Sequence, residues 1–220
     1  MRHALRFLLD LVIPRRCAGC GAPDVGWCDA CAAELRAPFA VEREALAHGP
    51  PVYALGRYRG AARRGVLAYK ERGRRDLAGP FGAALASALL SLPEVRAGPC
   101  YLVPAPSRPA AARRRGGPHM LNLARHCAAT LAHAGQAAAV APALRLGARA
   151  RDSVGLDAAA RAANLRGRLR SVPAGAPPPG QPVVLVDDVI TTGATAAACT
   201  EVLARAGNPV LAVVAVTAAG

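Results

Sequence analysis

Two groups of residues in this sequence could carry chemistry. The first is an acid pair, Asp187 and Asp188, which follows four apolar residues in the string VVLVDDVITTGAT at residues 183–195. The second is a set of four cysteines in the first part of the chain. The acid pair stands in a basic protein of 220 residues with a formal net charge of +14, so its two carboxylates need a specific explanation.

The four cysteines form two Cys-x-x-Cys pairs, Cys17 with Cys20 and Cys28 with Cys31, separated by seven residues. Each pair can offer two thiolates to one ion from a tight turn, and two pairs complete a tetrahedral shell. We therefore predict a structural zinc site, whose closed shell leaves no open position for catalysis. A redox dithiol pair and two disulfides are the alternatives, although structural disulfides are disfavoured in a cytosolic chain.

The residues around the acid pair suit a phosphorylated sugar. The segment 189–195 offers backbone N–H groups, the hydroxyls of Thr191 and Thr192, and Gly193, and it leads into a helix whose N-terminus favours an anion. Hydroxyls and amides suit a phosphate monoester, and carboxylates suit vicinal sugar hydroxyls, directly or through Mg²⁺. Neither a Walker A loop nor a dinucleotide-binding GxGxxG motif occurs in the chain.

The basic residues are almost all arginine, since 27 of the 28 are Arg and the exception is Lys70. Thirteen of these arginines fall between Val95 and Val186, where Asp152 and Asp157 are the only acids. Such a field attracts polyanions, either nucleic acid or a phosphorylated small molecule. A codon bias toward arginine, with the charge spread over a solvated surface, explains the same composition, so charge alone does not decide between them.

Strands and helices are expected to alternate along the chain. Strands are predicted over 52–58, 101–103, 138–140, 183–187 and 210–216, and helices over 77–92, 118–133 and 194–205, with a further candidate helix at 157–165. This order predicts an α/β fold with a parallel sheet flanked by helices.

The N-terminal segment is expected to form a short amphipathic helix, because Leu5, Leu8, Leu9 and Val12 fall at helical spacing. Asp10 interrupts the apolar run, and no small-residue cleavage site follows it, which argues against a signal peptide. No apolar run approaches the roughly 20 residues needed to span a bilayer. We expect a soluble, cytoplasmic protein without a membrane span.

The string VVLVDDVITTGAT resembles the signature of type I phosphoribosyltransferases that binds 5-phosphoribosyl 1-pyrophosphate (PRPP). With the cysteine-bearing string PRRCAGCG at residues 14–21, the chain resembles the ComF family, and the resemblance covers nearly its full length. The resemblance implies a type I phosphoribosyltransferase-like parallel sheet flanked by helices, with a small N-terminal zinc-binding module. It divides the chain into an N-terminal helix and Cys₄ zinc module at 1–50 and a phosphoribosyltransferase-like domain at 51–220.

The resemblance also implies roles for individual residues. In the family pattern the two acids, here Asp187 and Asp188, contact the ribose hydroxyls. The loop after them holds the 5′-phosphate, a role that carries over to Val189, Thr191, Thr192, Gly193, Ala194 and Thr195.

Three further segments follow the same template. LVPAPS at 102–107 resembles the strand end of the family's pyrophosphate loop, which assigns Pro104 and Ala105 to PRPP. RRRG at 113–116 matches the start of the family's RRRGFNQ motif and assigns Arg115, whereas Gly117, Pro118 and His119 replace Phe-Asn-Gln. Arg161 belongs to an L-x₄-R-x₂-N-x₂-G pattern beginning at Leu156, in a segment that would form a mobile lid; Ser153 stands where the family usually has Gln.

Lys70 lies in LAYKERGR, where the family also tends to carry Lys. A lysine retained in a chain that otherwise uses arginine suggests that a compact ammonium is needed, and we assign it to the pyrophosphate. A stray surface lysine is the alternative. With Asp187 and Asp188 it completes the predicted catalytic set, in which positioning, Mg²⁺ and cationic stabilisation of the leaving pyrophosphate carry the reaction.

Two functions follow from these observations. The first is a PRPP-binding, Mg²⁺-dependent phosphoribosyltransferase whose acceptor the sequence does not identify. The second, implied by the family name, is a nucleic-acid-binding accessory protein of DNA uptake, with a regulatory PRPP site and with single-stranded DNA and a competence ATPase or helicase as partners. Tyr53, Tyr58 and Tyr69 interleave with basic residues, as in single-strand binding, but they could equally pack inward.

Overall fold

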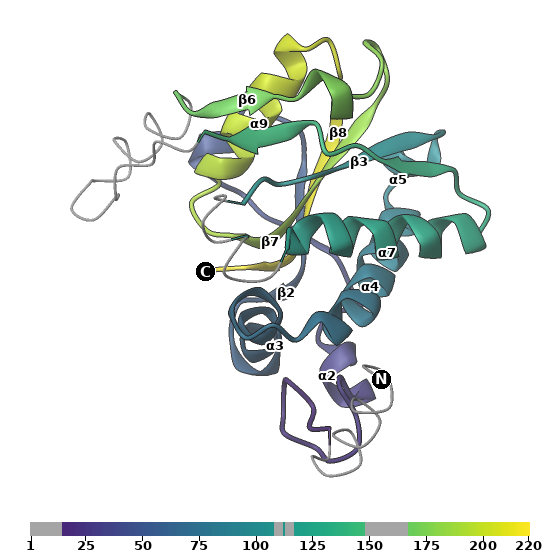
Figure 1. Cartoon of the computed structure of the whole chain (residues 1–220), viewed down its shortest axis with the longest axis vertical. Coiled ribbons are helices and arrows are strands. Elements are labelled where there is room, and N and C mark those ends of the chain that lie inside the picture. The colour runs from purple at the N-terminus through teal and green to yellow at the C-terminus, as the bar shows by residue number, and fades with distance from the viewer. Residues whose placement is uncertain (1–14, 108–111, 113–116, 148–166) are drawn as a thin grey trace, which may run out of the picture.

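The computed structural model describes residues 15–107, 112, 117–147 and 167–220. A six-stranded sheet with the order β1-β2-β8-β7-β3-β4 forms its centre (Figure 1). All neighbouring strands are parallel except the β1–β2 pair, which confirms the predicted α/β fold with a mostly parallel sheet. The strands are β1 (Phe39–Ala40), β2 (Val52–Arg57), β8 (Val210–Ala218), β7 (Val183–Ile190), β3 (Cys100–Pro104) and β4 (Ala138–Val140).

Helices cover both faces of this sheet, so the central strands are apolar on both sides. In β7, Val184 and Val186 face a core shared with α3 (Gly60–Glu71), α4 (Ala78–Ser91) and α7 (His119–His133). Val183 and Leu185 face a second core, shared with α9 (Ala194–Arg205). Burial on both faces explains why β7 reads as a continuous apolar run and not as an alternating one.

The predicted elements that the structure describes lie close to where the sequence placed them. However, β7 is longer than predicted, and α3, β1 and a short two-stranded ribbon were not predicted. The strand predicted to end at Asp187 continues to Ile190, because Val189 and Ile190 pair with Thr217 and Ala218 of β8. An antiparallel ribbon of β5 (Leu144–Leu146) and β6 (Leu169–Ser171) was not predicted, since three-residue strands are too short to show a pattern. The predicted helices at 5–12 and 157–165 lie outside the described residues.

The N-terminal cysteine segment shares its core with the sheet. Trp27, Cys31 and Leu35 belong to the same buried cluster as Phe81 of α4, and the Trp27 and Phe81 rings meet edge to face at 5.2 Å. The boundary predicted at residue 50 falls between η1 (Glu44–Leu46) and β2, although β1, on the N-terminal side of it, pairs with β2. The other short helices are α2 (Asp29–Ala33), η2 (Arg75–Leu77), α5 (Pro93–Arg96) and η3 (Pro173–Gly175).

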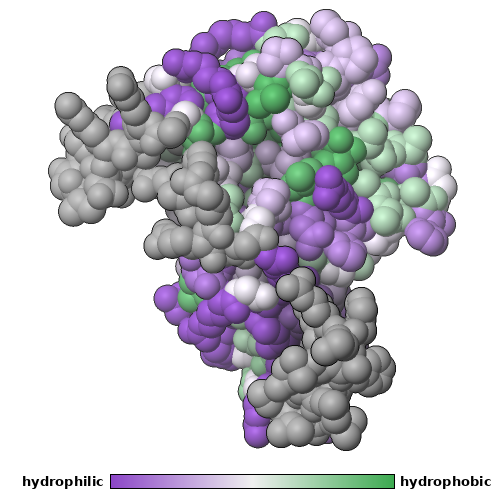
Figure 2. Space-filling view, in the orientation of Figure 1, coloured by the Kyte–Doolittle hydropathy of each residue, from purple (hydrophilic) through white to green (hydrophobic). Residues whose placement is uncertain are grey.

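Arginines fasten this segment to α3 and the turn that follows it. Arg64 donates to the carbonyl of Gly19, and Arg74 donates to the carbonyls of Arg16 at 3.0 Å and Gly26 at 3.1 Å. Figure 2 shows hydrophilic residues gathered over the lower part of the view, where Figure 1 places α3. Part of the basic charge therefore serves internal structure. Among the described residues, no helix is long and apolar enough to cross a bilayer.

Gly65 of α3 provides a test of the shared core. A Cβ built on Gly65 would lie 2.5 Å from Cζ3 of Trp27, whereas one on Gly79 of α4 would meet no atom within 4 Å. We expect Gly65→Ala to lower the free energy of unfolding by about 1–3 kcal/mol through overpacking. The matched change Gly79→Ala should be neutral or slightly stabilising. Urea denaturation measures both, and equal effects of the two substitutions would contradict this packing.

Candidate functional site

The two acids lie within β7, near its carboxyl end, and they point to opposite faces of the sheet. Neighbouring side chains in a strand alternate between faces. Asp188 therefore shares the face of Val184 and Val186, under α3 and α7, and Asp187 shares the face of Leu185, under α9. Both are buried, with relative exposures of 9% for Asp187 and 3% for Asp188. The acid pair of the sequence thus becomes two carboxylates in different surroundings.

Asp188 is held by two partners from different helices. Lys70 Nζ of α3 donates to Oδ1 at 2.9 Å, and His119 Nε2 of α7 donates to Oδ2 at 2.8 Å. Burial alone would raise the pKa of Asp188, but the His119 hydrogen bond and the Lys70 charge outweigh it and hold the pKa below its usual value. The structure therefore brings the three residues together around an ionised carboxylate.

Asp187 lies on the opposite face of the strand, beside α9. Its Oδ1 accepts the backbone N–H of Asp188 at 2.8 Å. Burial raises the pKa of Asp187 to about 7, and the negative charge of Asp188 adds to this effect. Near neutral pH the pair thus carries between one and two negative charges, and Asp187 is the carboxyl group that changes charge.

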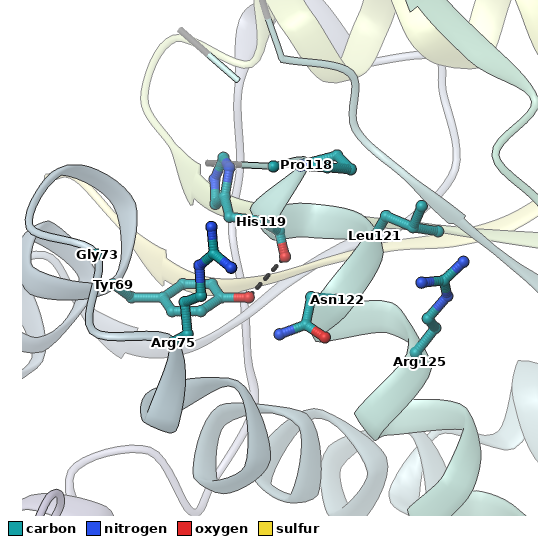
Figure 3. A pocket seen from close by; sticks show the side chains of 9 residues that line it. Tyr69, Gly73, Arg75, Pro118, His119, Leu121, Asn122 and Arg125 are labelled. Atoms are coloured by element: carbon teal, nitrogen blue, oxygen red, sulfur yellow. Dashed lines mark hydrogen bonds between the residues drawn. The ribbon is translucent and has the colours of Figure 1, made fainter. Parts of the chain in front are cut away.

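His119 is fixed on three sides. Its backbone oxygen accepts a hydrogen bond from the Tyr69 hydroxyl at 2.6 Å, drawn as the dashed line in Figure 3, and the two rings meet edge to face at 5.7 Å. Ser107, in the segment that follows β3, has its Oγ 3.4 Å from His119 Nδ1. His119 therefore places an imidazole against Asp188.

Pro104 and Ala105 lie beside the acids. Pro104 pairs with Val186 across the β3–β7 ladder, and the Ala105 N–H donates to the Val186 carbonyl at 2.8 Å. Since β3 and β7 are parallel neighbours, both end at the edge of the sheet where such folds bind ligands.

The segment after β7 has the features of an anion-binding turn. Thr191 and Thr192 are exposed, and Gly193 caps α9 in a left-handed conformation with φ 80°. The Ala194 N–H donates to Thr192 Oγ1 at 3.4 Å. The amides of Thr195 and Ala196 precede the first intrahelical bond, which runs from the Ala197 N–H to the Gly193 carbonyl at 2.9 Å. Val189 lies in β7 just before this turn, so the residues predicted to bind the phosphate follow one another from the end of β7 to the start of α9.

Arg43 supports this turn from the N-terminal part of the chain, and the sequence did not identify it. Its Nε donates to the Thr191 carbonyl at 2.5 Å, and its Nη2 donates to the carbonyl of Ala219. A Cβ at Gly193 would lie 3.1 Å from the Arg43 Cβ. No local pattern could reveal a contact between residues 148 positions apart.

The four predicted zinc ligands come together. Every pair of the Cys17, Cys20, Cys28 and Cys31 sulfurs lies within 4.8 Å, and three pairs are 3.5–3.7 Å apart. Four sulfurs at about 2.3 Å from a central ion stand about 3.8 Å apart, so the cluster fits a tetrahedral zinc. Cys100, Cys127 and Cys199 are buried elsewhere and take no part in it.

The backbone around Cys17 favours the thiolate that a metal needs. Burial would raise the pKa of this thiol, but backbone hydrogen bonds from Cys20, Cys28 and Gly19 lower it to about 6. The Cys28 N–H, for example, lies 3.4 Å from the Cys17 sulfur. No two of these sulfurs are within the roughly 2.05 Å of a disulfide.

The three tyrosines do not form one stacking surface. Tyr69 is buried, with a relative exposure of 4%, as the inward-packing alternative predicted. The Tyr53 hydroxyl donates to Glu94 Oε1 at 3.2 Å, and Arg63 lies over the Tyr58 ring at 5.7 Å. Single-stranded DNA and a competence ATPase or helicase stay predicted partners.

Arg115 and Arg161 lie outside the described residues, as does most of the segment beginning at Leu156 for which a lid is predicted. Comparisons of the chain with models of known protein families and with curated proteins found no match. The described residues that remain, around Asp188 and the 191–195 turn, form the candidate site.

Removal of one thiolate should release the metal. We expect wild-type protein purified without chelators to hold about one zinc per chain, and Cys31→Ser to hold far less. Trp27 is the only tryptophan and packs beside this cluster, so its emission should shift to longer wavelength in the variant. Cys100→Ala, at a buried cysteine outside the cluster, should keep the zinc. Elemental analysis that finds no zinc in the wild type would contradict the site.

The raised pKa of Asp187 predicts a pH-dependent stability. An unfolded Asp ionises near pH 4 and the folded one near 7, so the folded protein loses stability as the pH rises from about 4 through 7. Asp187→Asn removes this titration, so the free energy of unfolding of the variant should rise relative to that of the wild type by a few kcal/mol between pH 5 and pH 8. Urea denaturation at both pH values measures the difference, and a gap independent of pH would rule out the shift. Asp29→Asn, at an exposed carboxyl, is the control.

Proposed function

We propose that this protein binds PRPP and transfers its phosphoribosyl group, with Mg²⁺, to an acceptor. One observation carries the proposal. A buried, ionised carboxylate, Asp188, lies near the end of a parallel strand and is paired with Lys70. From this strand the chain passes directly into the hydroxyl-rich turn that precedes α9 at Gly193.

The turn suits the 5′-phosphate. The first-turn amides of a helix and its positive dipole end attract a phosphate, and Thr191 and Thr192 add exposed hydroxyl donors. Arg43 is bonded to the carbonyl of Thr191, so one carbonyl of the turn is already occupied by a donor. This bond holds the turn in place without using any of its N–H or hydroxyl donors, so those donors can bind a ligand.

The carboxylates suit the ribose and the metal to different degrees. Both oxygens of Asp188 already accept hydrogen bonds, from Lys70 and His119. Asp187 is the carboxylate better able to offer an oxygen to Mg²⁺ or to a ribose hydroxyl, once it is ionised. When bound, the ion would neutralise charge on the diphosphate of PRPP, with its other ligands taken from PRPP and water.

The chain's own residues would then contribute by position and charge. In the reaction the bond between C1′ and the diphosphate oxygen breaks, and its electron pair leaves with the diphosphate. Asp187 and Asp188 would favour the positive character that develops on the ribose. Lys70 has a side chain that is 32% exposed, so its ammonium can reach the leaving diphosphate while it stays paired with Asp188.

A thermal-shift experiment with PRPP, with and without Mg²⁺, tests this function. A ligand that binds only the folded protein raises its free energy of unfolding, by about 2.7 kcal/mol at a ligand concentration 100 times the Kd, and therefore raises its melting temperature. We expect a shift for the wild type and for the control Asp29→Asn, and none for Asp187→Asn/Asp188→Asn. Since the double variant could be less stable by itself, each protein is compared with its own ligand-free sample. An equal shift in the double variant would exclude this site.

A further inference from the structure

A pocket of about 330 Å³ lies next to the Asp188 centre, between the C-terminal end of α3 and the start of α7 (Figure 3). Tyr69 and Arg75 line it from the α3 side, and His119, Asn122 and Arg125 line it from α7. The side chain of His119 is therefore both a wall of the pocket and a partner of Asp188. A molecule in this pocket would lie beside the acid centre and in contact with His119.

The lining is suited to an anion. Arg75 and Arg125 both line it with guanidinium groups, Asn122 adds an amide, and none of its described residues is acidic. Arg125 is exposed on α7 and makes no ion pair with any described residue. A guanidinium presents paired N–H donors whose geometry matches a carboxylate, and the Asn122 amide adds donors nearby.

The size and the apolar part of the wall restrict the ligand further. Ligand pockets span roughly 300–1,000 Å³, so this one is at the small end and suits a single ring better than a nucleotide. Pro118 and Leu121 contribute apolar surface beside the polar groups. The combination of apolar surface and a guanidinium fits a ring that carries a carboxylate.

We propose that this pocket binds the acceptor of the phosphoribosyl group, and that the acceptor is a single-ring carboxylate held by Arg125 and Asn122. This inference rests on the proposed function. A nitrogen or oxygen of the acceptor forms the new bond to C1′ of PRPP as the C1′–O bond to diphosphate breaks. The diphosphate leaves with the electron pair, and the proton that the acceptor loses passes to water.

Matched pairs of ring compounds test the pocket. Nicotinate and nicotinamide share one ring, and orotate differs from uracil by its carboxylate. We expect calorimetric titration to detect binding of the two carboxylates and at least tenfold weaker binding of their neutral partners. Arg125→Gln should weaken carboxylate binding at least tenfold while the thermal shift with PRPP is kept. The control Arg96→Gln, at an exposed arginine of α5, should change neither.

The possible outcomes distinguish failure of the acceptor pocket from failure of the proposed PRPP-binding function. A PRPP shift without Arg125-dependent binding of either carboxylate overturns the acceptor pocket and leaves the PRPP site standing. Absence of a PRPP shift in the wild type overturns the proposed function, and the acceptor role with it. Inorganic pyrophosphate that displaces the carboxylates and itself depends on Arg125 would make the pocket a diphosphate site, which also contradicts the proposal.

Discussion

The buried carboxylate of Asp188 constrains much of this molecule. An ionised group with a relative exposure of 3% is tolerated only when charges and hydrogen bonds replace its lost water, and loss of one partner of such a pair costs about 3–5 kcal/mol. Its two partners, Lys70 and His119, come from α3 and α7, so the need to satisfy one charge fixes two helices against β7. The same two helices form the walls of the neighbouring pocket. The arrangement of these helices around the end of β7 therefore depends on the contacts of one carboxylate.

The N-terminal part of the chain supports this centre from two directions. Trp27, beside the cysteine cluster, packs over Gly65 of α3, the helix that carries Lys70. Arg43 binds the carbonyl of Thr191 in the turn that leads into α9. Metal binding at the cysteines would thus stabilise the helix that supplies the cation, because the two share one core. The N-terminal segment therefore packs as part of the same core as the sheet and contacts the turn after β7.

Local patterns in the sequence were sufficient for five of the six strands of the sheet, the helices α7 and α9, and the cysteine cluster, because each is encoded by neighbouring residues. The contact of Lys70 with Asp188 spans 118 positions, and nothing in the sequence measures such a distance. The split of the two acids between opposite faces does follow from strand alternation, but only once β7 is known to continue to Ile190. Arg43 and the pocket around Arg125 are products of tertiary packing and left no pattern to read.

We propose that PRPP binds at the carboxyl edge of β7. The most direct measurement is a crystal structure of the chain with Mg²⁺ and a carbocyclic analogue of PRPP that cannot react. We expect the 5′-phosphate on the amides and hydroxyls of residues 191–195 and the sugar ring beside Asp187 and Asp188. Density for the analogue at any other part of the molecule, or an edge left empty at saturating analogue, would contradict it.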